Sequence, residues 1–192
     1  LYLNRGDHTD AETAYCSGVE ATEWSWGVRF LDLDLDGYED LLVNTGFSYD
    51  YQDLDSQQKM GRKISRTQGD KRFLTEYPRL RLQNKVFRND GDRTFTEQGR
   101  EWGFATGKDV SHGLATADFD HDGDLDVVVS RLNDRALLFE NTATAPRIAV
   151  RLSGAPPNTQ AIGATVTLEG GPADGAPQTR ELTAGGDYLS GS

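Results

Sequence analysis

The sequence predicts an all-β fold, and three observations support this prediction. Short runs of alternating or β-branched residues recur along the chain, separated by turns rich in Gly, Asn and Asp. A segment of about 85 residues occurs twice, and its beginning occurs a third time. Each copy contains an acidic nine-residue loop between two strand-like runs. Repeats of several short strands are typical of propeller blades, so the sequence predicts partial β-propeller blades.

The repeat is defined by its first residues and by its loops. LYLNRGD at 1–7 corresponds to VFRNDGD at 86–92, an offset of 85, and LFEN at 138–141 begins a third copy. The acidic loops are separated by 86 residues, from 32 to 118. One residue of slippage over this distance still indicates a repeat. Other equivalent pairs are Gly18 with Gly103, Ser25 with Ser111 and Gly27 with Gly113.

The acidic loops predict two calcium sites. The first loop reads DLDLDGYED at 32–40 and the second reads DFDHDGDLD at 118–126. Two carboxylates roughly 4 Å apart repel by on the order of 4 kcal/mol at an effective dielectric of about 20, which favours a bound cation. Oxygen ligands and a glycine at position six, with the position-seven carbonyl of Asp124 as a further ligand, are typical of calcium. The predicted side-chain ligands are Asp32, Asp34, Asp36, Asp40, Asp118, Asp120, Asp122 and Asp126.

Two other kinds of loop share part of this pattern. An EF-hand shares the first six positions but closes with Glu at position twelve between two helices. Here position twelve is Val43 or Val129, and the closing acid at position nine runs directly into aliphatic residues, so each loop is expected to join two strands. A solvated acidic turn without metal is the other alternative, which four carboxylates at this spacing, twice, disfavour.

Composition restricts the classes of partner and location. The formal net charge of the 192 residues is −11, and two bound dications would leave −7. An acidic surface argues against nucleic acid and anionic membranes as partners. No run approaches the ~20 apolar residues of a membrane span, so no direct membrane insertion is predicted. Cys16 is the single cysteine, which excludes a disulfide within the chain. Weak calcium sites fill outside the cytoplasm, which predicts an extracellular or periplasmic protein.

The chain divides into two predicted domains. Residues 1–145 hold the blades and 146–192 form a small β-sandwich-like module, apparently truncated, with alternating runs at 147–152, 164–168 and 178–183. Because Leu1 is not an initiator, the chain is expected to begin within a longer protein or after processing.

Copy one carries an insertion. The first loop aspartate precedes the next repeat's Asn by 57 residues in copy one (32 to 89) and by 23 in copy two (118 to 141), so 34 residues are inserted near 46–83. Ser56 to Ser65 predicts a short helix, broken or bent at Gly61. The segment is either a partner-binding excursion or a solvated surface loop. Its basic residues are Lys59, Arg62, Lys63, Arg66, Lys71, Arg72, Arg79 and Arg81.

Other motifs have ordinary structural interpretations. Arg5-Gly6-Asp7 matches the tripeptide that integrins read, but Asp90-Gly91-Asp92 stands at the same repeat position, which favours a blade turn. The tryptophans could form an aromatic ligand platform, although packing between blades is favoured. The histidines form no zinc spacing and no pair with a nucleophile. These residues are Trp24, Trp26 and Trp102, and His8, His112 and His121.

The combination of LYLNRGD, SWGVRFLDLDLDGYEDLLV, VFRNDGDRTF and SHGLATADFDHDGDLDVVV resembles the FG-GAP/VCBS repeats of integrin-type β-propellers, in the cartilage acidic protein group with its bacterial relatives. The tail, beginning RIAVRLSGAPPNTQAIGATVTLEGG, is similar to the ASPIC/UnbV module. The resemblance implies calcium-stabilised blades with the ligands above and with backbone carbonyls from Tyr38 and Asp124. A propeller needs at least about four blades, more than are visible here.

These observations lead to one favoured function and two alternatives. The favoured function is a non-enzymatic, extracytoplasmic interaction or scaffold module in which calcium is structural and a protein partner or larger assembly is bound. One alternative is a hydrolase or lyase built on a complete propeller. The other is an accessory subunit of a larger assembly. Fold alone does not decide among them, because propellers host many functions.

Overall fold

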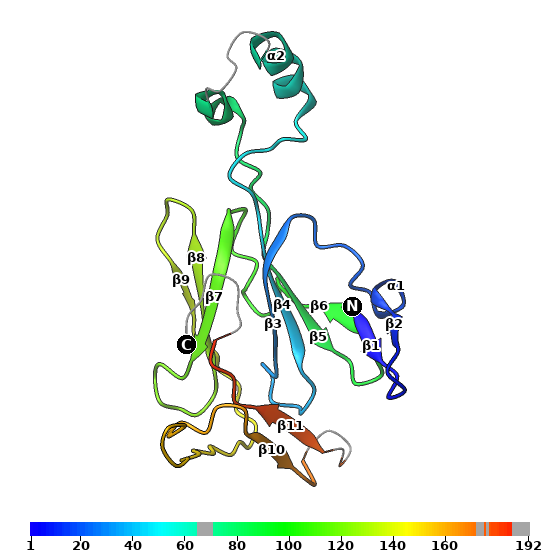
Figure 1. Cartoon of the computed structure of the whole chain (residues 1–192), viewed down its shortest axis with the longest axis vertical. Helices are drawn as coiled ribbons and strands as arrows, with labels where there is room; N and C mark the ends of the chain where they lie inside the picture. The colour runs from blue at the N-terminus through cyan, green and yellow to red at the C-terminus, as the bar shows by residue number, and fades with distance from the viewer. Residues whose placement is uncertain (65–70, 172–174, 176, 186–192) are drawn as a thin grey trace.

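The computed structural model describes residues 1–64, 71–171, 175 and 177–185 and shows an all-β protein with few helices (Figure 1). The strands in this described part of the chain form four antiparallel sheets. The first sheet is β1 (Tyr2–Asn4) and β2 (Asp10–Glu12); the second is β3 (Ser25–Leu31), β4 (Asp40–Thr45), β5 (Lys85–Asn89) and β6 (Phe95–Glu97); the third is β7 (Ser111–Ala117), β8 (Asp126–Arg131) and β9 (Leu137–Phe139); the last is β10 (Thr165–Leu168) and β11 (Gln178–Glu181). The predicted fold class is confirmed.

Two sheets correspond to the two copies of the repeat, and we call β3 to β6 blade one and β7 to β9 blade two. In both, the first two strands are shifted in register at the same place. Ser25 pairs with Thr45 before the shift in blade one, and Ser111 pairs with Arg131 in blade two. Each acidic loop joins the first strand of a blade to the second, as expected from the aliphatic residues that follow it.

The hairpin β1–β2 repeats the hairpin β5–β6 in detail. The Gly6 amide donates to Asn4 Oδ1 at 2.8 Å, and the Gly91 amide donates to Asn89 Oδ1 at 3.0 Å. Asp7 and Asp92 each accept from the amide two residues further on, at 3.1 and 3.0 Å. Both central glycines have positive φ, a conformation that glycine adopts without steric cost. The Arg-Gly-Asp tripeptide therefore lies in a blade turn.

The main core lies between the two blades. Buried side chains on the face of blade one that is turned toward blade two pack against side chains of blade two. A smaller cluster occupies the opposite face of blade one. Because successive side chains of β4 and β8 point to opposite faces, each of these strands contributes every second residue to the interface between the blades. The main cluster comprises Leu42, Val86, Phe104, Leu114, Val127 and Val129, and the smaller one Leu41, Val43 and Phe87.

The first strands of the blades approach each other at Gly27. A Cβ atom at this glycine would lie 2.8 Å from the His112 carbonyl oxygen, closer than a side chain tolerates. Nearby, the Asn44 side-chain amide donates to the Gly113 carbonyl at 3.1 Å. The lack of a side chain at Gly27 is thus what allows the two sheets to pack closely.

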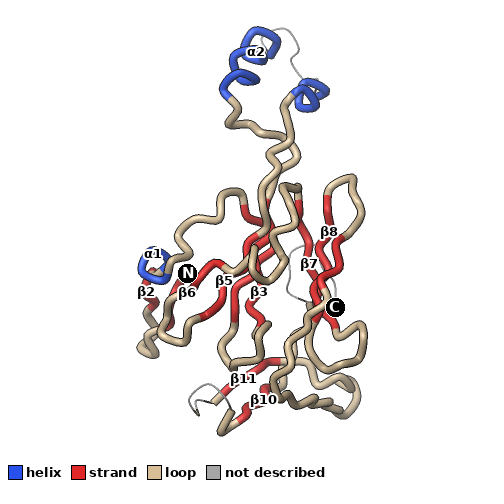
Figure 2. The backbone as a smooth tube through the Cα atoms, turned by 180° about the vertical axis from the view of Figure 1, so that it is seen from behind, coloured by secondary structure: helices blue, strands red, loops and turns tan. Residues whose placement is uncertain are grey.

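The insertion leaves blade one after β4 and returns before β5, and Figures 1 and 2 show it projecting away from the sheets. An isolated bridge between Phe47 and Leu80 closes its base. Trp24 and Trp26 pack on the Phe47 ring, with centroids 4.5 and 5.4 Å away, and the Trp26 indole donates to the Gly46 carbonyl. These two tryptophans therefore pack against neighbouring rings and do not form an open aromatic platform.

The helix in the insertion differs from the prediction. Helix α2 (Leu54–Ile64) begins two residues before the predicted helix and is not broken at Gly61, while a bend there stays a prediction. A 3-10 helix follows at Lys71–Glu76. Asp53 accepts from the Ser56 amide at 2.6 Å and so satisfies a free donor at the helix start. A single internal glycine costs only about 1 kcal/mol. Ser65 and Arg66 lie outside the described residues.

The tail lies beside the acidic loops, at the end opposite the insertion (Figure 1). Strands β10 and β11 confirm two of the predicted strands, whereas the strand predicted at 147–152 is wrong. Ile148 and Val150 are exposed there, and no pairing strand in the described residues covers them, so alternation alone did not create a sheet. The short α1 (Ala14–Ser17) lies near β2, and the domain boundary at 145/146 stays a prediction.

Candidate metal centres

The two acidic loops have the same backbone conformation. At position four, Leu35 and His121 have φ of 59° and 64°, and at position six Gly37 and Gly123 both have φ of 96°. The left-handed region is unfavourable for residues other than glycine, and yet position four adopts it in both loops. The other residues of the loop must therefore impose this conformation. The repeated aspartate pattern therefore specifies one particular turn.

The position-nine carboxylates tie each loop to its blade. Asp40 accepts from the amides of Leu33 and Asn89, both at 2.9 Å, and is fully buried. Asp126 accepts in the same way from Phe119 and Asn141 at 2.9 and 2.8 Å. Each carboxylate thus connects the loop start to the third strand of its blade.

The position-one carboxylates have one oxygen satisfied and one not. Asp32 Oδ2 accepts from the Gly37 amide at 3.0 Å, and Asp118 Oδ2 accepts from Gly123 at 3.1 Å. The other oxygen, Oδ1 in both residues, is buried and has no hydrogen-bond partner in the described protein. Leaving a buried acceptor unsatisfied costs about 1–3 kcal/mol. A cation coordinated by this oxygen would remove the cost, so the loops fit a metal ion.

Three carboxylates converge in each loop. Oxygens of Asp32, Asp34 and Asp40 lie within 4.8 Å of one another, as do oxygens of Asp118, Asp120 and Asp122. Of the predicted side-chain ligands, Asp36 and Asp126 stand outside these groups. Tyr38 and Asp124 occupy position seven, and their carbonyls as ligands stay a prediction. The Asp124 side chain is itself buried, and neither of its oxygens has a hydrogen-bond partner among the described residues.

Each loop also contacts an arginine that the sequence pattern did not indicate. Arg88 on β5 lies 2.7 Å from Asp34 and 2.5 Å from Asp36. Arg147 donates to the Asp122 carbonyl at 2.9 Å and pairs with the Asp122 carboxylate at 3.1 Å. The repeat could not reveal Arg88, because Glu140 stands at the equivalent position.

Burial makes the first loop costly to ionise. Desolvation raises the pKa of Asp32 to about 6 and that of Asp40 to about 7, against the opposing effect of their backbone hydrogen bonds. In the second loop, desolvation followed by the Asp122 charge raises the pKa of Asp124 to about 6. A hydrogen bond from the Asp124 amide lowers the pKa of Asp122. Keeping these buried carboxylates ionised therefore costs free energy, and a bound cation would reduce that cost.

The histidines lie apart from these groups. His8 is exposed in the β1–β2 turn, and His121 is exposed in the second loop. His112 packs against Trp26 with ring centroids 4.6 Å apart, and burial lowers the pKa of its imidazole. Among the described residues, no histidine belongs to a group of possible metal ligands. The side chain of His112 contributes to packing between the blades.

Comparison with known families supports the blade assignment. Residues 73–129 match the model of the FG-GAP-like repeat, a segment that includes β5, β6, β7 and the second loop. A repeat of this kind suggests a propeller-type interaction module. Searches of curated proteins and of solved structures returned no match. The matched segment stops before the tail, so the resemblance to an ASPIC/UnbV module and to the cartilage acidic protein group stays a prediction. No helix in the described residues is long and apolar enough to cross a membrane.

Proposed function

We propose that this protein is a propeller-type interaction module whose blades are stabilised by two calcium ions. The observation that carries the proposal is the buried, unpartnered oxygen at position one of both loops. In loop one the ion would be held by Asp32, Asp34 and Asp40, and in loop two by Asp118, Asp120 and Asp122. Hard oxygen ligands in a flexible loop favour calcium over transition metals.

Calcium would act structurally. Its ligands would include Asp40, which also accepts hydrogen bonds from Leu33 at the start of the first loop and from Asn89 on β5, so the ion would join the first, second and third strands of the blade. A ligand present at 100 times its Kd stabilises the folded state by about 2.7 kcal/mol. A contribution of this size per site is a substantial fraction of the total stability of a typical domain, which is about 5–15 kcal/mol.

The proposed partner is another protein and the proposed location is extracellular or periplasmic. FG-GAP-like repeats commonly mediate protein interactions, and the net charge of −11 disfavours nucleic acid. Weak calcium sites are filled where free calcium is about millimolar, which is outside the cytoplasm.

The direct test is calorimetric titration of calcium into chelator-stripped protein, together with thermal unfolding. We expect two equivalents and a higher melting temperature. Asp32→Asn and Asp118→Asn should each remove one equivalent. Asp55→Asn, in the first turn of α2, makes the same charge change away from the loops and should leave both. Unchanged stoichiometry in the two loop variants would exclude these sites.

A second experiment uses Arg88. In the Asp118→Asn background only loop one binds calcium, and its ion must compete with the Arg88 guanidinium for Asp34 and Asp36. Arg88→Gln should therefore increase the calcium affinity at least several-fold, whereas Arg100→Gln, an exposed arginine outside the loops, should not. Equal affinities in the two variants would contradict direct competition.

A further inference from the structure

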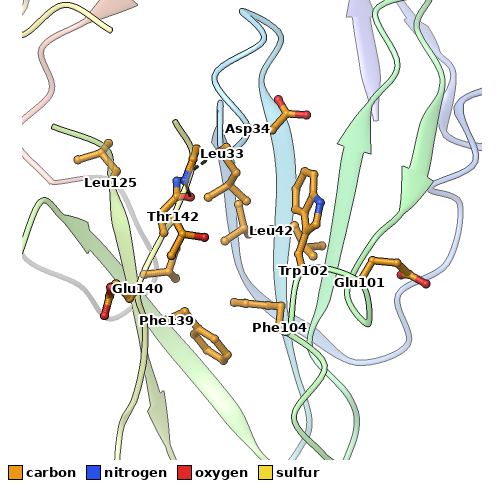
Figure 3. A pocket seen from close by; sticks show the side chains of 14 residues that line it. Leu33, Asp34, Leu42, Glu101, Trp102, Phe104, Leu125, Phe139, Glu140 and Thr142 are labelled. Atoms are coloured by element: carbon orange, nitrogen blue, oxygen red, sulfur yellow. Dashed lines mark hydrogen bonds between the residues drawn. The ribbon is translucent and has the colours of Figure 1, made fainter. Parts of the chain in front are cut away.

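A cavity of about 340 Å³ lies between the blades, close to the first acidic loop. Its apolar lining includes Leu42 and Phe104 on one side and Val127 and Phe139 on the other. Figure 3 shows Thr142 and Trp102 on opposite sides of Leu33 and Leu42, with Phe104 and Phe139 below them. This volume is within the range of ligand sites in proteins.

The two blades differ at their outer edge. In blade one, β6 pairs with β5, with Asn89 opposite Phe95 and Phe87 opposite Glu97. The Phe95 side chain packs against the cluster of Leu41, Val43 and Phe87. In blade two, no strand among the described residues pairs with the outer edge of β9. The backbone groups along this edge are available to another strand.

The repeat places the cavity where blade two lacks a counterpart of Phe95. Leu41 and Phe87 pair across β4 and β5, and their equivalents, Val127 and Phe139, pair across β8 and β9. Val127 and Phe139 line the cavity. In blade one, Phe95 stands opposite Asn89 and covers Phe87. An aromatic residue that stands opposite Asn141 on an added strand would therefore point into the cavity in the same way.

We propose that the cavity and the free edge of β9 form an acceptor site for an extended segment of a partner protein. The segment adds a fourth strand to blade two and inserts one aromatic side chain between the blades. Main-chain hydrogen bonds supply affinity and the cavity supplies specificity, as in other complexes formed by strand addition. The inference rests on the interaction function proposed above but requires no calcium ligand.

Charge around the cavity indicates the flanking residues of the partner. Glu101 and Glu140 line it, are exposed, and have no ion-pair partner among the described residues. Asp34 lies at the same rim, where it is paired with Arg88. Opposite charges across an interface favour encounter and register. The partner segment therefore carries Lys or Arg beside its aromatic residue.

A peptide of residues 92–99 with Glu97→Lys is the probe, because β6 is the strand that occupies the equivalent place in blade one. Binding is followed by NMR on labelled protein, with shifts expected at the β9 amides and around the cavity. The peptide with Phe95→Ala should bind at least tenfold more weakly. Raising the salt concentration should weaken the lysine-bearing peptide more than the original sequence.

Protein variants complete the test. Thr142→Trp should fill the cavity from its rim, raise the melting temperature and reduce peptide affinity at least tenfold, while Thr144→Trp, exposed nearby, should leave affinity unchanged. Equal binding of the alanine peptide, or unchanged affinity in Thr142→Trp, would overturn the proposal. Concentration-dependent self-association that Thr142→Trp abolishes would also overturn it, since the occupant would be a second copy.

The peptide titration is run with calcium-loaded and calcium-stripped protein. Loss of peptide binding with two calcium equivalents intact would overturn the acceptor site alone. Peptide binding without any calcium binding would support the acceptor site and refute the calcium function.

Discussion

The two acidic loops are nearly identical in backbone and hydrogen bonding, yet their surroundings differ. No residue of loop one is exposed, and Asp40 is fully buried, whereas Asp120 and Asp122 in loop two are exposed. Among the described residues, loop one is attached to a four-stranded blade and loop two to a three-stranded one. The comparison shows that local sequence determines the turn, while the position of a blade in the stack determines how much its loop and faces are covered.

The largest expected difference between the blades concerns their equivalent outward faces. Leu42 in blade one is fully buried against blade two, and Leu138, on the same face of blade two, is 61% exposed. Leu42→Ala should lower the free energy of unfolding by about 2–5 kcal/mol because it leaves a cavity. Leu138→Ala should cost less than about 0.5 kcal/mol. Chemical denaturation measures both, and similar costs would show that the faces are equally covered.

A smaller and equal effect is expected at position nine. Asp40→Asn and Asp126→Asn each replace one acceptor oxygen by an amide donor that faces a backbone N–H group. Each variant should lower the free energy of unfolding in calcium-stripped protein by about 1–3 kcal/mol. Asp134→Asn, outside the loops, serves as the control. A loss of stability in only one of the two variants would show that the two turns are not equivalent.

The pH dependence should arise from two carboxylates in loop one and from Asp124 in loop two, whose pKa burial also raises to about 6. With pKa values raised to about 6 and 7, Asp32 and Asp40 keep protons in the folded state that the unfolded chain releases near its ordinary pKa of 3.8. Stability of the calcium-stripped protein should therefore fall as pH rises from about 4 to about 7. Calcium binds the ionised carboxylates, so saturating calcium should offset the fall.

Urea unfolding at pH 5 and pH 8 tests this pH dependence. Asp40→Asn should flatten the fall. His112, whose pKa burial lowers, acts in the opposite sense, because its unfolded form binds more protons below pH 6.5. His112→Phe should accordingly steepen the fall. Equal stability of the stripped protein at both pH values would contradict the assignment.

The smallest effect is expected at the outer hairpin of blade one. Lys85 and Glu97 form an ion pair of 2.8 Å between β5 and β6, and both side chains are partly exposed. Exposed pairs contribute about 0–1 kcal/mol, so Glu97→Gln should change the free energy of unfolding by less than about 0.5 kcal/mol. A larger loss, resistant to high salt, would mean that the fourth strand depends on this contact.

Features set by neighbouring residues could be predicted from the sequence, and features set by distant ones could not. The order strand, acidic loop, strand followed from spacing, because each Asp accepts from an amide only a few residues away. Arg88 reaches Asp34 across 54 positions, and no repeat pattern marks it. The alternation at 147–152 failed as a predictor because Arg147 is directed to Asp122 instead of a sheet. Strand formation requires a pairing edge, which alternation does not report.

The close approach at Gly27 has a geometric consequence. Where one local contact fixes the rotation between neighbouring units, repeating it about an axis sets the rotational order of the whole ring. Gly27 allows the His112 carbonyl to approach the first strand of blade one, and Gly113 stands at the same repeat position. A methyl group at this point would wedge the inner strands apart and widen the angle between units. The angle between these two blades thus depends on the absence of a side chain at Gly27.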